Sequence, residues 1–106
     1  MTTTADFNAS WLVASSSSAL VLANDKFEIS AANSTQAQVS CTRTILSPPS
    51  ETAFYSAPAE ISGNKLIAVN STATIELWRN GAGLDFRVIL AGTTDEEGGG
   101  SSLGPG

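Results

Sequence analysis

The stretch TIELWRNGAGLDFRVIL, residues 74–90, decides the fold because two runs of alternating apolar and polar residues flank a glycine-rich turn. Alternation with a period of two is typical of strands that bury one face. When the runs close around residues 80–83, the buried face pairs Leu77 with Phe86, Ile75 with Val88 and Ala73 with Leu90. The reverse face pairs Glu76 with Arg87 and Trp78 with Asp85. A slip by one residue would lose both sets of pairs, so the sequence predicts this hairpin and this register.

The Gly81-Ala82-Gly83 turn also resembles a phosphate-binding loop. Such a loop needs a helix directly after its glycines, because the helix N-terminus supplies N–H groups to the phosphate. An alternating strand follows here instead. The glycines are therefore interpreted as residues that supply the positive φ angles of a tight hairpin.

The upstream sequence indicates further strands. The apolar residues of 27–31 are expected to lie opposite those of 37–41 around a turn at residues 33–35. A turn at Asn24-Asp25 would place Leu20 and Leu22 on the preceding strand, and residues 11–14 (WLVA) can add one more.

Further along the chain, Pro48 and Pro49 lack the N–H that a strand ladder needs. We expect them to break the sheet, with a loop that crosses to a second sheet. A turn at residues 62–64 then leads into KLIAV, residues 65–69. The sequence thus predicts an all-β fold, a small antiparallel β-sandwich or barrel of about seven or eight short strands with extended termini.

The domain organisation follows from composition. Residues 1–92 are expected to form one β domain with an extended N-terminal segment. Residues 93–106 (TTDEEGGGSSLGPG) are acidic and then rich in Gly and Ser, so we expect a flexible tail. In residues 10–23, serines interrupt the apolar residues and no Lys or Arg precedes them, so no signal peptide is predicted. Synthesis in the cytoplasm is the corresponding expectation.

The charge pattern argues against several partners. The chain of 106 residues has a net charge of −5, and its 5 Lys and Arg residues are scattered along the sequence. A nucleic acid needs a cluster of cations to neutralise its phosphates, and an anionic membrane attracts basic segments. We therefore expect neither nucleic acid nor membrane as a partner.

Residue usage also argues against an enzyme. Histidine is absent, so the Ser/His/Asp triad and imidazole metal ligation are not available. Cys41 is the single cysteine, and its apolar surroundings predict a buried small side chain with no neighbouring base. We predict no catalytic, cofactor-binding or metal-binding residues, and no cofactor.

Acidic and aromatic residues are the candidates for a metal site, a glycosidase site or a sugar-binding site. Asp95, Glu96 and Glu97 are consecutive, whereas a Ca²⁺ loop spaces its ligands. Glu51 and Glu60 have no fixed separation that would make them a glycosidase pair. A sugar could stack on aromatic rings, for which the candidates are Trp11, Tyr55 and Trp78.

One apolar surface stands out on the side of the hairpin opposite to Leu77. Trp78 and Ile89 share that side, and the preceding strand can add Ile67 and Val69. A core covers one face of a sheet only, so the N-terminal segment or another subunit must cover this one, and we favour a subunit. The interface candidates are Trp78, Ile89, Ile67, Val69, Trp11 and Leu103.

A small all-β body, no histidine, sparse charge, abundant Ala, Ser, Thr, Asn and Gly, and extended termini together resemble the decoration (cement) proteins and other minor structural proteins of tailed-bacteriophage virions. The resemblance implies a non-enzymatic capsid decoration protein on the virion surface. It would form a homo-oligomer, bridge neighbouring major capsid protein subunits or other virion proteins, and stabilise the shell. The alternatives are a carbohydrate-binding or adhesin-like β domain and a surface-filament subunit.

Overall fold

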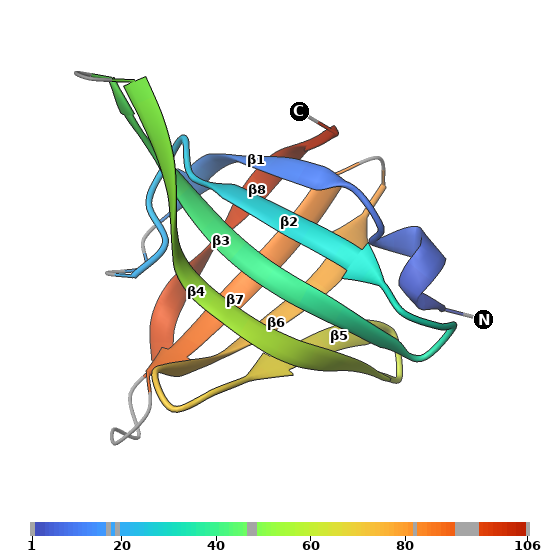
Figure 1. Ribbon diagram of the computed structural model, residues 1–106. Helices are drawn as coiled ribbons and strands as arrows, with labels where there is room; N and C mark the ends of the chain where they lie inside the picture. Colours follow the sequence, from blue (N-terminus) through green and yellow to red (C-terminus); the bar gives the residue numbers. More distant parts are fainter. Residues whose placement is uncertain are drawn as a thin grey trace.

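The computed structural model describes residues 2–16, 18, 20–46, 49–81, 83–90 and 96–105. Strands β1 to β8 form a closed antiparallel barrel in which each strand pairs with its sequence neighbours and β8 returns to β1 (Figure 1). The prediction of a small antiparallel all-β fold is confirmed, and the sheet closes as a barrel. In the described part of the chain no helix has the length and hydropathy that a membrane span requires.

A short 3₁₀ helix, η1, precedes the strands, and the elements have these bounds: η1 Thr4–Asp6, β1 Ser10–Ser16, β2 Lys26–Ala31, β3 Gln36–Leu46, β4 Pro49–Ser62, β5 Lys65–Val69, β6 Ala73–Asn80, β7 Gly83–Leu90 and β8 Glu96–Pro105.

The β6–β7 hairpin has the predicted register. Leu77 pairs with Phe86 on the buried face and Glu76 pairs with Arg87 on the other, and the remaining pairs also match. Gly81 has a φ of +62°, which is a conformation that glycine adopts without steric cost. The interpretation of this glycine as a hairpin residue is therefore confirmed.

The N-terminal part of the barrel differs in one strand from the prediction. β2 and β3 pair as expected, with Ile29 opposite Val39. The strand predicted around Leu20 and Leu22 is wrong, because β1 is the neighbour of β2 and these two leucines lie in the loop between β1 and β2. That loop is held by the buried Asp25 carboxylate, which accepts a hydrogen bond from the backbone N–H of Leu22 at 2.8 Å.

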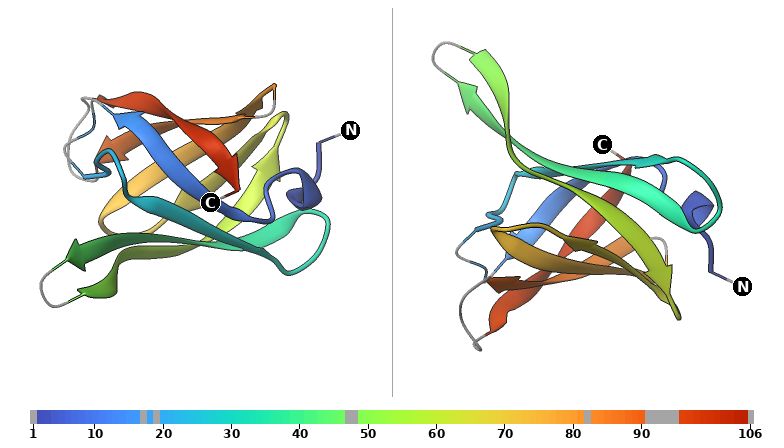
Figure 2. Two further views of the ribbon diagram at one scale, coloured as in Figure 1. Left: turned by 90° about the horizontal axis from the view of Figure 1, so that it is seen from above. Right: turned by 60° about the horizontal axis from the view of Figure 1, so that its bottom comes forward.

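The prolines do not carry the chain to a second sheet. β3 and β4 pair directly with each other from Gln36–Glu60 out to Leu46–Pro49, so that expectation is corrected. Pro49 is the first residue of β4, where a missing N–H costs the ladder little. Pro48 lies outside the described residues. The two strands continue past the barrel and project from it (Figures 1 and 2).

Both termini contribute to the body of the barrel. Phe7, just after η1, has no exposed side-chain surface and belongs to the core. The Thr4 N–H donates to the carbonyl of Ser34 at 3.1 Å. At the other end of the chain, β8 pairs with both β1 and β7. This differs from the predicted flexible tail over residues 93–106: backbone hydrogen bonds can order Gly- and Ser-rich residues without apolar side chains, because every barrel strand needs two neighbours.

Apolar side chains fill the interior of the barrel. Phe27 from β2 and Phe86 from β7 meet across it edge to face, with ring centroids 5.0 Å apart. Aromatic pairs of this geometry contribute roughly 0.5–1.5 kcal/mol beyond the area that they bury.

We predict that Phe86→Ala lowers the free energy of unfolding by roughly 3–5 kcal/mol, because it removes a ring that is 1% exposed and leaves a cavity. The control is Asn80→Ala, which loses only an exposed hydrogen bond to Asp85. Urea unfolding of both variants measures the difference. Equal small losses would contradict the buried position of Phe86.

A candidate protein-binding face

The outward side chains of β5, β6 and β7 form a continuous grid, which we call the outer β5–β7 face. It exists because alternate residues of these strands point into the core and leave the others outside. Cross-strand pairing arranges its nine residues in three rows: Lys65–Trp78–Asp85, Ile67–Glu76–Arg87 and Val69–Thr74–Ile89.

Four of the predicted interface residues lie on this face. Val69 is 54% exposed, while Ile67, Trp78 and Ile89 are half-buried. The structure therefore brings these four together, as their alternation predicted. Apolar side chains gathered on one face of a sheet are typical of a surface that binds another protein.

A charge cluster lies at the centre of the face. The Glu76 carboxylate lies 3.4 Å from the Lys65 ammonium and 3.6 Å from the Arg87 guanidinium. The Lys65 ammonium also lies 5.3 Å from the centre of the Trp78 ring. Partly exposed pairs of this kind contribute little to folding, roughly 0–1 kcal/mol each. With Asp85 included, the two cations and two anions of the face balance to zero.

A hollow of about 460 Å³ adjoins the face on the β4 side. Ile67 and Val69 belong to both the hollow and the face, and Ile61 and Pro58 form the opposite wall with Glu60 and Ser62. The hollow is open to solvent and has both apolar and polar lining residues, so it could accept an amphipathic side chain of a partner.

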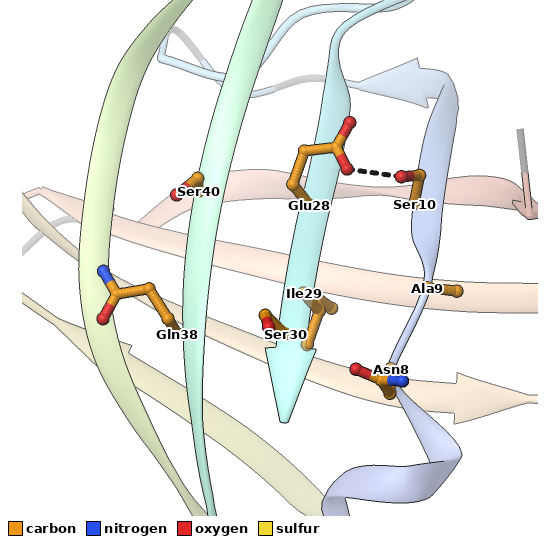
Figure 3. Close-up of a pocket in the computed structure, with 8 residues that line it drawn as sticks. All are labelled: Asn8, Ala9, Ser10, Glu28, Ile29, Ser30, Gln38 and Ser40. Carbon is orange, nitrogen blue, oxygen red and sulfur yellow. Dashed lines mark hydrogen bonds between the residues drawn. The ribbon is translucent and has the colours of Figure 1, made fainter. Parts of the chain in front are cut away.

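A second hollow, of about 310 Å³, lies over β1, β2 and β3 and is polar (Figure 3). Ser10 donates a hydrogen bond from its hydroxyl to the Glu28 carboxylate there. Gln38 is at its edge and donates to the Ser56 hydroxyl at 2.7 Å. The lining contains no aromatic side chain, so it offers hydrogen bonds to a ligand but no stacking surface.

Two predicted aromatic candidates belong to the core. Trp11 is 3% exposed and donates its indole N–H to the Phe7 carbonyl at 2.8 Å. Tyr55 is equally buried and donates to the Ala73 carbonyl at 2.8 Å. Each polar ring atom finds a backbone acceptor, which permits full burial. The interface role predicted for Trp11 is therefore corrected, and Tyr55, a candidate only for the sugar-stacking alternative, belongs to the core. Trp11 is thus no surface contact of the barrel, and the three aromatic residues form no common stacking platform.

The remaining candidates are also separated. Glu51 and Glu60 both lie on β4 and are nine residues apart, which is roughly 30 Å along a strand. Two carboxylates of a glycosidase must lie within about 10 Å of each other. Leu103 lies on β8, where only the backbone is described, and the side chains of Asp95, Glu96 and Glu97 also lie outside the described part.

Comparisons with protein-family models, with curated proteins and with solved structures found no match to this chain. Among the described residues, no three Cys, Asp or Glu side chains gather as a metal site would require.

Cys41 is buried on the inner side of β3, as the sequence predicted. Burial raises the pKa of its thiol well above the ordinary value, and the negative charge of Asp25 acts in the same direction. The thiolate is the reactive form, so Cys41 is inert in the folded protein.

We predict that a thiol reagent at pH 8 labels native Cys41 roughly a hundredfold more slowly than unfolded Cys41, because the thiol is both protonated and inaccessible. Absorbance kinetics with an aromatic disulfide, with and without urea, measure the ratio. Equal rates in both states would contradict the buried position of Cys41.

Proposed function

We propose that this protein is a non-enzymatic structural protein of a virion, a capsid decoration protein that oligomerises and bridges neighbouring capsid subunits. The observation that carries the proposal is the outer β5–β7 face, which combines exposed apolar side chains with balanced charge. The composition and extended termini of the chain resemble those of phage decoration proteins, and this resemblance is the reason for proposing a capsid protein as the partner.

The chemistry of the face favours a protein partner. A surface that binds nucleic acid carries an excess of cations, whereas Lys65 and Arg87 are both adjacent to Glu76. A partner that covers the face would remove the exposed parts of Trp78 and Val69 from water. Full burial of an exposed apolar side chain contributes roughly 1.5–3 kcal/mol, and these partly buried side chains gain a fraction of that. Tryptophan that is ringed by other contacts is also the residue most enriched at binding hot spots.

The described reactive groups support a binding role. An active site commonly contains titratable groups with shifted pKa values inside a cleft. In this chain burial raises the pKa of Cys41 and of Tyr55, and both side chains lie in the packed core. Neither lines the polar hollow over β1 to β3 or the hollow on the β4 side of the outer β5–β7 face.

The face is expected to contact the capsid shell. A small barrel can place this face against the shell while its other side remains in water. The polar outer surface of β1 to β3, with Ser10, Gln38 and Ser40, suits the solvent side.

The test is Trp78→Ala, compared with Leu22→Ala, which removes a 44% exposed side chain outside the face. We expect Trp78→Ala to weaken binding to shells of a candidate major capsid protein at least tenfold, because it deletes the largest apolar contact. Leu22→Ala should bind as the wild type does. Co-sedimentation measures binding, and urea unfolding measures the fold.

If Trp78→Ala binds as tightly as the wild type, the outer β5–β7 face is not the contact surface. A glycan array provides the control for the carbohydrate-binding alternative. Specific capture of a sugar that is lost in Trp78→Ala, with no binding to shells, would replace the proposal by that alternative.

A further inference from the structure

The projecting hairpin is the most unusual part of the barrel. The last pair between β2 and β3 is Lys26–Thr42, and the pairs between β4 and β5 begin at Ala59–Ala68. Residues 43–46 therefore pair only with residues 49–52. We call residues 43–46 and 49–54 the arm. Figures 1 and 2 show the arm extending away from the barrel wall.

A β-bulge marks the base of the arm. Cys41 pairs with Tyr55 and Thr42 pairs with Ala53, so Phe54 is an extra residue in β4. A bulge bends its strand and increases the local twist, which explains why the arm leaves the barrel here. The Arg43 guanidinium lies 4.5 Å from the centre of the Phe54 ring and packs over it.

The two edges of the arm differ. The β3 edge is covered at its base, where Arg43 bonds to the Asp25 carboxylate at 2.8 Å and to the Leu20 carbonyl at 3.0 Å. The β4 edge has no partner strand in the described residues between Pro49 and Pro58. Near its base, the Asn70 side chain donates to the Ser56 carbonyl at 3.0 Å. The open edge is therefore residues 50–55.

Hydrogen bonding shows which backbone groups point outward along this edge. The Ala32 N–H donates to the Gln36 carbonyl, so even-numbered residues of β3 face β2 and odd-numbered residues face β4. The pairs Arg43–Thr52 and Ile45–Ser50 are consequently the hydrogen-bonded ones of the arm. The β4 residues that alternate with Ser50 and Thr52 are Glu51 and Ala53. Their backbone N–H and C=O groups therefore point away from β3.

The centre of this edge has little protection against pairing. Natural edge strands are shielded by Lys residues, prolines, bulges or a covering element, and here the proline and the bulge lie at the two ends of the edge. Between Pro49 and Pro58 the sequence is SETAFYSA, with Glu51 as its single charged residue and no Lys or Arg. An edge with a single charge and no covering strand at its centre can pair with another extended strand.

We propose that the β4 edges of two copies of this chain pair with each other, antiparallel, about a twofold axis at Thr52. In this register the outward groups of Glu51 meet those of Ala53 in the other copy, and each pair exchanges N–H···O bonds in both directions. The product is a four-stranded sheet in the order β3, β4, β4 and β3. The two copies thereby bridge through their arms and leave both barrels free.

Charge and symmetry identify the second copy as the occupant. The two outward-facing residues are placed symmetrically about Thr52, so the edge is complementary to itself under a twofold rotation. Each Glu51 carboxylate lies opposite the small Ala53 and not opposite the other Glu51. The two Thr52 side chains face each other, which is a favourable cross-strand pair.

The expected dimer is weak. The paired segment is short, so the interface lies below the roughly 1,200 Å² of stable complexes and belongs to the transient class. Ile45, which is 49% exposed, adds an apolar side chain near the interface. The pairing depends on the arm alone and does not depend on the outer β5–β7 face or on a capsid.

Disulfide trapping in the full chain tests the register. Opposed residues of a non-hydrogen-bonded pair have Cα atoms about 4.5 Å apart, which suits a disulfide. We expect Thr52→Cys to form a covalent dimer on mild oxidation at least tenfold faster than Gln38→Cys, an exposed position on the part of β3 that belongs to the barrel wall. Wild-type Cys41 is buried and provides the background rate.

Sedimentation velocity over a concentration series, up to about 1 mM, tests the association itself. The wild type should show reversible dimers, and Ala53→Pro should be monomeric because it removes an outward N–H while the pairs with β3 remain. Circular dichroism checks that the variant folds. Glu51→Pro is a second variant that removes an outward N–H, and it should also be monomeric.

Leu22→Ala, outside the outer β5–β7 face, should leave both the trapping rate and the association unchanged. Binding to capsid shells is measured separately with Trp78→Ala, so failure of the arm and failure of the capsid contact are distinguishable. A wild type that is monomeric throughout, or equal trapping rates for Thr52→Cys and Gln38→Cys, would overturn the pairing of the arms.

Discussion

The contact between Phe27 and Phe86 is the constraint on which the barrel depends. The two rings come from β2 and β7, which face each other across the interior, and they meet with centroids 5.0 Å apart. A barrel of this size closes only if side chains of opposite walls fill the space between them. Once the interior is filled, the inner side chain of every strand position is committed to packing, and only the outer side chains, the loops and the arm remain for binding.

This division explains the character of the outer surface. Leu77 and Ile75 fill the core, so the residues between them, Glu76 and Trp78, must face outward. An ordinary solvent-exposed strand would place polar residues at all such positions. Trp78 and Val69 instead lie on the outer surface, beside an ion cluster that does not require apolar neighbours. These outward apolar side chains distinguish β5 to β7 from the polar wall of β1 to β3.

The β6–β7 register could be predicted from sequence because apolar pairing, charge pairing and loop length all required the same alignment. The same logic failed around Leu20 and Leu22, where the buried Asp25 holds a loop through Arg43, a residue 18 positions away. The prolines misled for a related reason. A proline breaks a strand ladder only at a position where a backbone N–H must donate to the neighbouring strand. Which positions must donate depends on how the strands pair, and the local sequence does not show that pairing. The burial of Trp11 and Tyr55 depends on backbone acceptors at Phe7 and Ala73, which become neighbours only in the closed barrel.

The outer β5–β7 face and the arm would act by different physical means. The face has apolar area and balanced charge, so its proposed binding energy would come from removing Trp78 and its neighbours from water, and it would depend on the shape of the partner. The proposed pairing of the β4 edge would come mainly from backbone hydrogen bonds, whose geometry fixes direction and register. Two weak contacts of these kinds reinforce each other when both are engaged, because the second forms at the high effective concentration set by the first. A barrel that joins one neighbour through its side and another through its arm could therefore remain bound to a large surface although neither contact is strong alone.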